Sequence, residues 1–241
     1  MRAFLHKLLQ GFGYDIHRFH AAALPEAQLA CALRSRGFNL VLDVGANAGQ
    51  FGLKLRDHGY GGRIVSFEPL EEPRQQLIEA ADADALWEVA ERAAIGDRDG
   101  EIDIHVSANS YSSSALDVLD SHLHAAPDSR YVGSERVPLR CLDAVALPYL
   151  HPDSVAFLKI DTQGFEDRVL DGAARILPRI GGIQLELSVV PLYSGQKLLP
   201  EMLERLRSLG FALWGIWPAL VEPDTGRVLQ VDATFFRSAG D

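Results

Sequence analysis

Four mainly apolar runs along this chain each have an acidic residue at or near their end. Apolar runs of about four to eight residues, bounded by polar or turn residues, are typical of parallel strands buried on both faces. Helical patterns follow these runs, and this alternation predicts an α/β fold with a parallel sheet. The predicted strands are residues 40–43, 63–68, 154–161 and 182–187, and the acids at or near their ends are Asp43, Glu68, Asp161 and Glu186.

Shorter or alternating patterns predict the remaining strands. Residues 87–95 form a third strand that ends in Gly96 and Asp97, and residues 211–217 and 231–236 form two closing strands with a turn at 223–226. Residues 101–107 alternate polar and apolar positions, which indicates a half-exposed antiparallel strand. Residues 136–142 are its expected partner, and Pro138 marks that partner as an edge strand because proline donates no ladder hydrogen bond.

A hydroxyl-rich loop at residues 109–115 lies between these two antiparallel strands and is followed by His122 and His124. We expect an inserted β-hairpin and lid at about residues 99–145, placed over the substrate side of the site. The alternative is a mobile polar loop without a binding role.

Residues 1–38 are expected to be helical and to precede the main domain at residues 39–241. Apolar residues at helical spacing occur twice, and Gly11–His17 lies between the two patterns. We expect this segment to pack against the sheet or to act as a lid. A homodimer contact and a membrane-surface helix are the alternatives, although Arg2, His6 and Lys7 are few cations for membrane binding. The apolar residues are Phe4, Leu5, Leu8 and Leu9, then Ala27, Leu29, Ala30 and Leu33.

Composition narrows the class of protein. The 241 residues include 33 acids and 23 lysines and arginines, for a net charge of −10, which argues against a nucleic-acid partner. Cys31 and Cys141 are too few for a disulfide framework. No apolar run approaches the ~20 residues that span a bilayer, and the start of the chain lacks a signal-peptide core. We therefore expect a soluble, cytoplasmic protein of one α/β domain with appendages.

The stretch from Leu40 to Gly49, LVLDVGANAG, predicts a strand, a glycine turn and the start of a helix. This layout binds a nucleotide against the backbone N–H groups at a helix start. A carboxylate at Asp43 repels a pyrophosphate, whereas it attracts the sulfonium and ammonium groups of S-adenosylmethionine. Glu68 follows 25 residues after Asp43 and is placed to accept both hydroxyl protons of a ribose. The alternative is a structural turn with a solvated acid.

Four motifs together resemble the FkbM-type S-adenosylmethionine-dependent methyltransferases: DVGANAG from Asp43, FEP from Phe67, AIGD from Ala94 and KIDTQGFE from Lys159. The resemblance runs from about Leu40 to Phe236. It implies a Rossmann-like class I methyltransferase fold, with a mostly parallel seven-stranded sheet and helices on both faces. Gln163 departs from it, because many relatives have Glu at this position.

The resemblance and the glycine turn together give the candidate binding residues. Ala94 is expected beside the adenine, and Ser113 and Ser114 are expected to line the substrate site, both on the strength of the resemblance. The full set of expected donor-binding residues is Asp43, Gly45, Ala46, Asn47, Gly49, Glu68, Pro69 and Ala94.

Asp161 and Glu186 remain for the chemistry, since the ligand of an open α/β sheet lies beyond the carboxyl ends of the strands. An alcohol is a poor nucleophile, so either acid is a candidate general base. Alternatively, the two acids could hold Mg²⁺ through their oxygen atoms, but two ligands are few for this ion and no metal site is predicted.

The resemblance implies methylation of a hydroxyl group, since members of this family mostly methylate hydroxyls, often on sugars or on polyketide and glycolipid natural products. We therefore predict a small-molecule O-methyltransferase that uses S-adenosylmethionine. The alternatives are an NAD(P)-dependent oxidoreductase on the same layout and a non-catalytic donor-binding protein.

Overall fold

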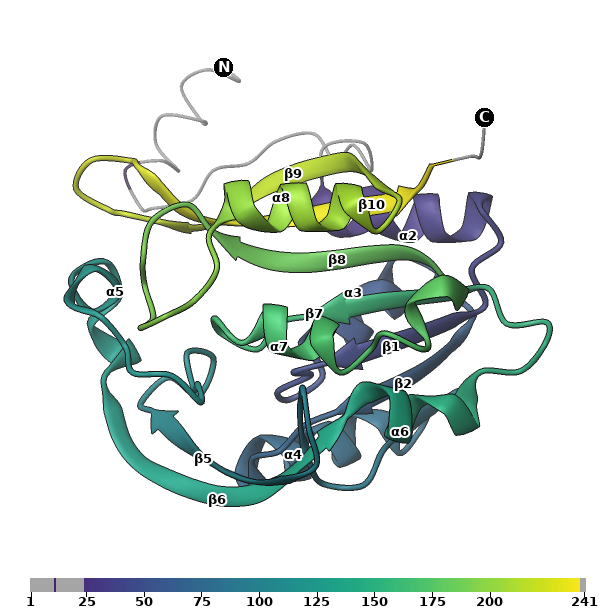
Figure 1. The fold of residues 1–241 in the computed structure, drawn as a ribbon, viewed down its shortest axis with the longest axis horizontal. Helices are drawn as coiled ribbons and strands as arrows, with labels where there is room; N and C mark the ends of the chain where they lie inside the picture. The colour runs from purple at the N-terminus through teal and green to yellow at the C-terminus, as the bar shows by residue number, and fades with distance from the viewer. Residues whose placement is uncertain (1–10, 12–23, 239–241) are drawn as a thin grey trace.

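The structure, a computed structural model, describes Gly11 and residues 24–238 (Figure 1). The expected first helix at Phe4–Leu9 and the segment Gly11–His17 lie outside the described residues, apart from Gly11. Within the described part of the chain, no helix is both long and apolar enough to cross a bilayer. The cytoplasmic location and the homodimer contact stay predictions.

A seven-stranded sheet with the order β3-β2-β1-β7-β8-β10-β9 forms the centre of the fold. The first five of these strands run parallel, whereas β10 is antiparallel to both β8 and β9. This topology confirms the expected mostly parallel Rossmann-like sheet. The strands are β1 (Leu40–Val44), β2 (Arg63–Phe67), β3 (Trp87–Val89), β7 (Ala156–Ile160), β8 (Ile180–Ser188), β9 (Phe211–Val221) and β10 (Val228–Arg237).

Helices cover both faces of this sheet, as the alternating pattern predicted (Figure 1). The apolar side chains of α2 (Pro25–Ser35), α3 (Gln50–Asp57) and α4 (Glu71–Ala81) pack against one face, in a cluster that contains Val41 and Phe157. Those of α6 (Leu142–Ala146), α7 (Glu166–Asp171) and α8 (Leu199–Ser208) pack against the other, with Leu42 and Leu158. Neighbouring residues of β1 and β7 thus point to opposite cores, because side chains alternate along a strand.

A second sheet contains three strands in the order β4-β6-β5, namely β4 (Ala94–Gly96), β6 (Tyr131–Cys141) and β5 (Gly100–Ser107). Helix α5 (Asp120–Ala125) and the short 3-10 turn η2 (Pro127–Ser129) lie between β5 and β6. The residues from 24 to 238 contain two further 3-10 turns, η3 (Leu147–Tyr149) and η4 (Leu177–Arg179). The boundary of the inserted region stays a prediction, although β5 and β6 pair antiparallel as expected.

Two details of the strand prediction were wrong. Residues 87–95 are not one strand, because β3 pairs with β2 in the large sheet and β4 pairs with β6 in the small one. Arg92 lies between them and donates its Nε hydrogen bond to the Pro69 carbonyl at 2.7 Å, which fixes the chain as it leaves the large sheet. Moreover, β6 is the central strand of its sheet despite Pro138, since its pairing with β4 begins one residue later, at Leu139.

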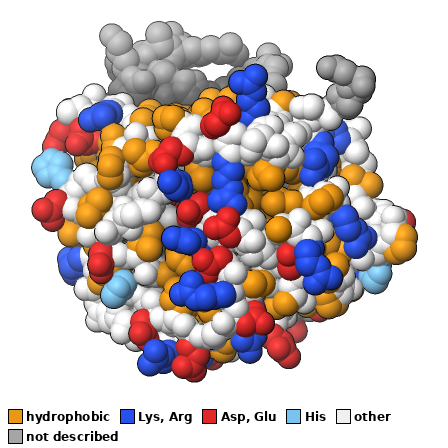
Figure 2. All heavy atoms as spheres, in the orientation of Figure 1, with side chains coloured by type: hydrophobic (Ala, Val, Ile, Leu, Met, Phe, Trp, Pro, Cys, Tyr) orange, Lys and Arg blue, Asp and Glu red, His pale blue; other side chains and the backbone are white. Residues whose placement is uncertain are grey.

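The C-terminal elements follow the prediction. Strands β9 and β10 form a hairpin closed by the Glu222 N–H donating to the Arg227 carbonyl at 2.9 Å. The antiparallel pairing of β10 with β8 places Asp232 opposite Glu186, at the same edge as the ends of β1 and β7. In the orientation of Figure 2, acidic and basic side chains of the described residues are interspersed on the viewed face.

Candidate functional site

The glycine turn after β1 approaches the end of β7 more closely than any side chain allows. Gly45 has a φ of +76°, and a Cβ atom built on it would lie 1.8 Å from the Asp161 carbonyl oxygen. Gly49, with a φ of +87°, precedes the first residue of α3. Both positions need the left-handed backbone that glycine adopts at low steric cost. The turn therefore brings the end of β1 against the end of β7.

Glu68 holds the turn from the end of the neighbouring strand β2. Its Oε2 accepts a hydrogen bond from the Asn47 N–H at 2.8 Å, and its Oε1 accepts one from the Leu70 N–H at 2.9 Å. Burial raises the pKa of Glu68 to about 7, although these two backbone donors oppose the shift. The carboxylate faces the cavity described below and keeps lone pairs for a ligand with hydroxyl donors.

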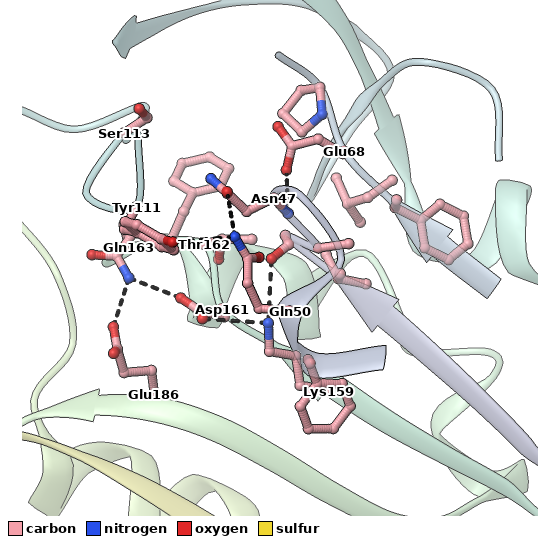
Figure 3. Close-up of a pocket in the computed structure, with 18 of the residues that line it drawn as sticks. Asn47, Gln50, Glu68, Tyr111, Ser113, Lys159, Asp161, Thr162, Gln163 and Glu186 are labelled. Carbon is pink, nitrogen blue, oxygen red and sulfur yellow. Dashed lines mark hydrogen bonds and ion pairs between the residues drawn. The ribbon is translucent and has the colours of Figure 1, made fainter. Parts of the chain in front are cut away.

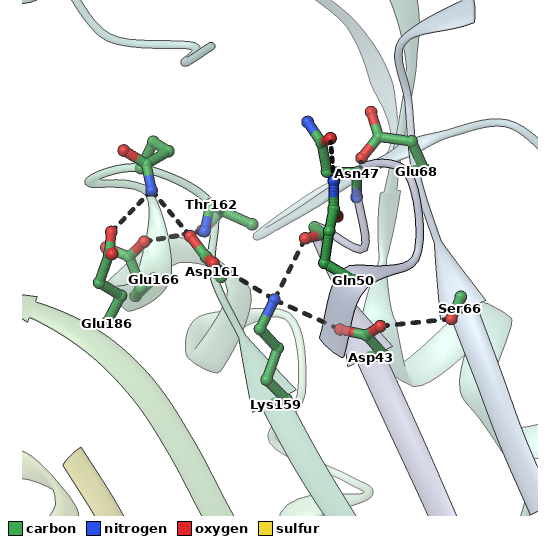
Figure 4. Close-up of polar contacts among 12 residues, drawn as sticks. Asp43, Asn47, Gln50, Ser66, Glu68, Lys159, Asp161, Thr162, Glu166 and Glu186 are labelled. Atoms are coloured by element: carbon green, nitrogen blue, oxygen red, sulfur yellow. Dashed lines mark hydrogen bonds and ion pairs between the residues drawn. The ribbon is translucent and has the colours of Figure 1, made fainter. Parts of the chain in front are cut away.

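Lys159 connects the acids of β1 and β7 (Figure 4). Its Nζ lies 3.4 Å from Asp43 Oδ1 and 3.3 Å from Asp161 Oδ2, and it donates to the Gly45 carbonyl at 3.2 Å. Burial alone lowers the pKa of Lys159, but Asp161 and Asp43 outweigh it and raise the pKa above its usual value. Asp43 is fully buried; burial raises its pKa, and Lys159 opposes that shift. Lys159 therefore links Asp43 and Asp161 by two ion pairs beneath the glycine turn.

A second polar cluster joins Asp161 to Glu186 through the amide of Gln163 (Figure 3). Gln163 Nε2 donates to Asp161 Oδ1 at 2.8 Å and to Glu186 Oε2 at 2.6 Å. The Tyr193 hydroxyl donates to Gln163 Oε1 at 2.7 Å, which turns the amide nitrogen toward the two acids. Gln163 itself has a φ of +52°, a left-handed conformation that is uncommon for a residue with a side chain.

Glu186 is the acid of this cluster most altered by its surroundings. Burial, followed by the charge of Asp161, raises its pKa well above the usual value. Its Oε2 also accepts a hydrogen bond from Gln230 Nε2 at 3.0 Å. A carboxyl group with a raised pKa takes up a proton at a higher pH than an exposed one, which suits acid–base chemistry.

The hydroxyl-rich loop at residues 109–115 closes one side of the site. Ser114 is buried, and its hydroxyl donates to the Gln163 carbonyl at 2.7 Å. The Ser113 hydroxyl accepts from the Ser107 N–H at 3.1 Å and donates to the Ser110 carbonyl at 2.9 Å. Asn47 Nδ2 donates to the Ser110 carbonyl at 3.3 Å, so the loop also touches the glycine turn.

These groups surround a cavity of about 340 Å³. Asp43 and Gly49 are not among the residues that line it, since Asp43 lies beneath the turn and faces Lys159. The other sequence-predicted residues do line it: Gly45, Ala46, Asn47, Glu68, Pro69, Ala94, Ser113, Ser114, Asp161 and Glu186.

A model of the FkbM methyltransferase domain matches residues 43–213, which is more than half of the chain. The chain belongs to the FkbM methyltransferase family. It is accordingly an S-adenosylmethionine-dependent methyltransferase, and the oxidoreductase alternative is dropped. No curated protein matches the chain in a sequence search.

Solved structures of similar shape are distant from this methyltransferase. TehB from Haemophilus influenzae has 11% identity and a TM-score of 0.49. The match covers 93% of this chain and 64% of the TehB chain. A precorrin-6y C5,15-methyltransferase from Geobacter metallireducens has 14% identity and a TM-score of 0.47, covering 88% and 87% of the two chains. A magnesium protoporphyrin IX methyltransferase from Synechocystis has 10% identity and a TM-score of 0.47, covering 98% and 96%. Likeness at this level assigns no substrate to the chain.

Several cavity residues of the methyltransferase were not given a role from the sequence. Lys159 breaks an otherwise apolar run, and a lysine inside a buried strand is a signal that a buried acid lies beside it. Asp232 lies in an alternating strand far along the chain, and only the antiparallel pairing of β10 with β8 brings it to the site. The remaining unassigned polar or aromatic lining residues include Glu26, Gln50, Phe51, Lys54, Tyr111, Phe165 and Gln184.

The site does not fit Mg²⁺ between its two candidate catalytic acids. Gln163 places an N–H donor, not an oxygen ligand, within 2.8 Å of Asp161 and 2.6 Å of Glu186. A divalent cation needs oxygen ligands around it. Across residues 24–238, no group of three or more His, Cys, Asp or Glu side chains is arranged to hold a metal ion.

Proposed function

We propose that this methyltransferase transfers a methyl group from S-adenosylmethionine to a hydroxyl of a small molecule, either a sugar or a glycosylated or polyketide natural product. One observation carries the proposal: a single cavity joins the glycine turn and Glu68 to the Asp161–Gln163–Glu186 cluster. A donor and an acceptor can therefore meet in one cavity, and alignment of two reactants is a large part of catalysis.

The donor end of the cavity fits an adenosine. Glu68 keeps acceptor capacity for a ribose diol, while the glycine at position 45 lets the turn lie directly against the end of β7. Pro69 and Ala94 continue the wall beyond Glu68 and offer an apolar surface to an adenine ring. Ala46 and Asn47 form the turn itself. In this assignment Asp43 acts on the donor only through Lys159, because its carboxylate is buried beneath the turn.

S-adenosylmethionine supplies a sulfonium methyl group that an oxygen nucleophile can displace. The protein's part is to orient the acceptor hydroxyl and to take its proton. Asp161 reaches the cavity directly beside the glycine turn, and we assign the proton to its carboxylate. Glu186 and Gln163 hold Asp161 in place, and Ser113 and Ser114 close the acceptor side.

A methyl-transfer screen tests the proposal. Purified protein is incubated with S-adenosylmethionine labelled in its methyl group and with sugars, glycolipids and polyketides, each beside a counterpart whose hydroxyls are blocked. We expect label in the free hydroxyl compounds and none in the blocked ones. Transfer to nitrogen or sulfur nucleophiles alone would contradict a hydroxyl acceptor while leaving methyl transfer intact.

A further inference from the structure

One end of the cavity carries hydrogen-bond acceptors that the proposed chemistry does not use. Asp232 and Gln184 line this end, together with Glu26 and Lys54. Gln184 is only 8% exposed, and its side-chain oxygen has no hydrogen-bond partner among the described residues. A buried acceptor without a donor is unfavourable, so the oxygen indicates a donor supplied from elsewhere.

The pairing of strands places these groups on one face of the sheet. Gln184 lies beside Lys159 of β7, and Asp232 lies opposite Glu186. Residues that alternate along one strand share a face, so Gln184 and Glu186 point the same way. Directly opposite residues of antiparallel strands have Cβ atoms about 5 Å apart. A ligand that reaches Glu186 can therefore reach Asp232 as well.

The cations near this end are already paired. Lys159 lies between Asp43 and Asp161, and Lys54 Nζ lies 2.8 Å from Glu26 Oε1. Asp232, by contrast, makes no ion pair within 4.0 Å among the described residues. Burial, and then the charge of Asp161, raises the pKa of Asp232 to about 6, so it remains largely a carboxylate at neutral pH. This end of the cavity is thus acidic and rich in acceptors, which opposes a phosphate and favours a cation with N–H donors.

We propose that Asp232 and Gln184, beside Glu186, form a subsite for a primary ammonium group of a ligand bound in this cavity. The inference rests on the proposed function. An ammonium offers three N–H donors and a positive charge, which match the Asp232 carboxylate and the unpartnered Gln184 oxygen. Two sources carry this chemistry: the amino-acid end of the methyl donor, and an amine on the acceptor such as that of an amino sugar.

Calorimetry on Asp232→Asn distinguishes the two sources. The ligands are S-adenosylhomocysteine, which has the amino-acid end, and 5′-methylthioadenosine, which lacks it. If the donor's ammonium occupies the subsite, the variant should bind S-adenosylhomocysteine about 10- to 100-fold more weakly, the range for a charged hydrogen bond, and methylthioadenosine unchanged. If an acceptor amine occupies it, binding of both should be unchanged. In that case labelled methyl transfer to amino sugars should lose its advantage over transfer to their N-acetyl forms.

Two further variants serve as a second probe of the subsite and as a control. Gln184→Met removes the acceptor at similar volume and should weaken the same ligand as Asp232→Asn, so the subsite can be probed even if one variant folds poorly. Asp224→Asn removes one charge from the exposed β9–β10 turn and should change nothing. If the Asp232 and Gln184 variants bind both ligands and discriminate amines as the wild type does, the subsite is refuted. If the wild type binds no S-adenosylhomocysteine at all, the proposed function fails instead.

Discussion

Replacing Lys159 with methionine should destabilise the protein strongly. The substitution keeps most of the side-chain volume but removes a cation that lies 3.4 Å from Asp43 and 3.3 Å from Asp161. Asp43 is fully buried, and without Lys159 its only remaining side-chain partner among the described residues is the Ser66 hydroxyl at 3.3 Å. Breaking a buried ion pair from one side leaves a buried charge uncompensated, which costs about 3–5 kcal/mol. We expect a loss of that size in the free energy of unfolding at pH 8.

Urea denaturation followed by circular dichroism measures this loss from the midpoint and slope of the transition. The matched control is Lys54→Met, which breaks the exposed pair with Glu26; the Lys54 side chain is 56% exposed, so at most about 1 kcal/mol should be lost. The Lys159→Met penalty should shrink as the pH falls, because burial raises the pKa of Asp43 and its protonation removes the unpaired charge. A loss below about 1 kcal/mol at pH 8 would contradict the claim that the buried ion pairs of Lys159 stabilise the fold.

Three further predictions concern the site. Glu68→Gln should weaken S-adenosylhomocysteine binding by about 1.5–3 kcal/mol in calorimetry. Wild-type binding should also weaken as the pH falls through about 7, the pKa of Glu68, since the carboxylate is the form that accepts two ribose protons. Binding that does not depend on pH would contradict this role. Asp161→Asn should lower turnover by about 10²–10⁴-fold with little change in donor affinity, whereas a collapse of donor affinity with turnover retained would make Asp161 a donor ligand. Gly45→Ala should lower both thermal stability and donor binding, because its Cβ would lie 1.8 Å from the Asp161 carbonyl oxygen; wild-type values for both would show that the turn relaxes.

Local sequence patterns were sufficient for most of the fold. The apolar runs ending at Asp43, Glu68, Asp161 and Glu186 identified β1, β2, β7 and β8, because buried parallel strands have a strong signature. Residues 87–95 were wrongly predicted to form one strand, since an apolar pattern does not indicate the sheet in which a segment pairs. Pro138 misled the prediction as well, because the constraint on proline concerns one backbone position and not the whole strand.

The site was harder to predict where it depends on which strands pair in the sheet and in which register. The convergence of the four acids follows from the parallel order of the strands. The burial of Asp43 under Lys159 does not, since it requires that β7 pair with β1 in one register. Asp232 and Gln184 became visible only through the pairing of β10 with β8. The bridge from Gln163 to both acids depends on a left-handed backbone at that residue, which sequence patterns do not reveal for glutamine.

A calorimetric titration of the wild-type protein with S-adenosylhomocysteine at pH 8, beside one with NAD, tests the central claim most directly. We expect saturable binding of S-adenosylhomocysteine at one site per chain and no heat from NAD, because the two lysines among the described lining residues, Lys54 and Lys159, are already paired with acids and leave no free cation there for a pyrophosphate. Saturable NAD binding with no response to S-adenosylhomocysteine would contradict the assignment of this cavity to the methyl donor.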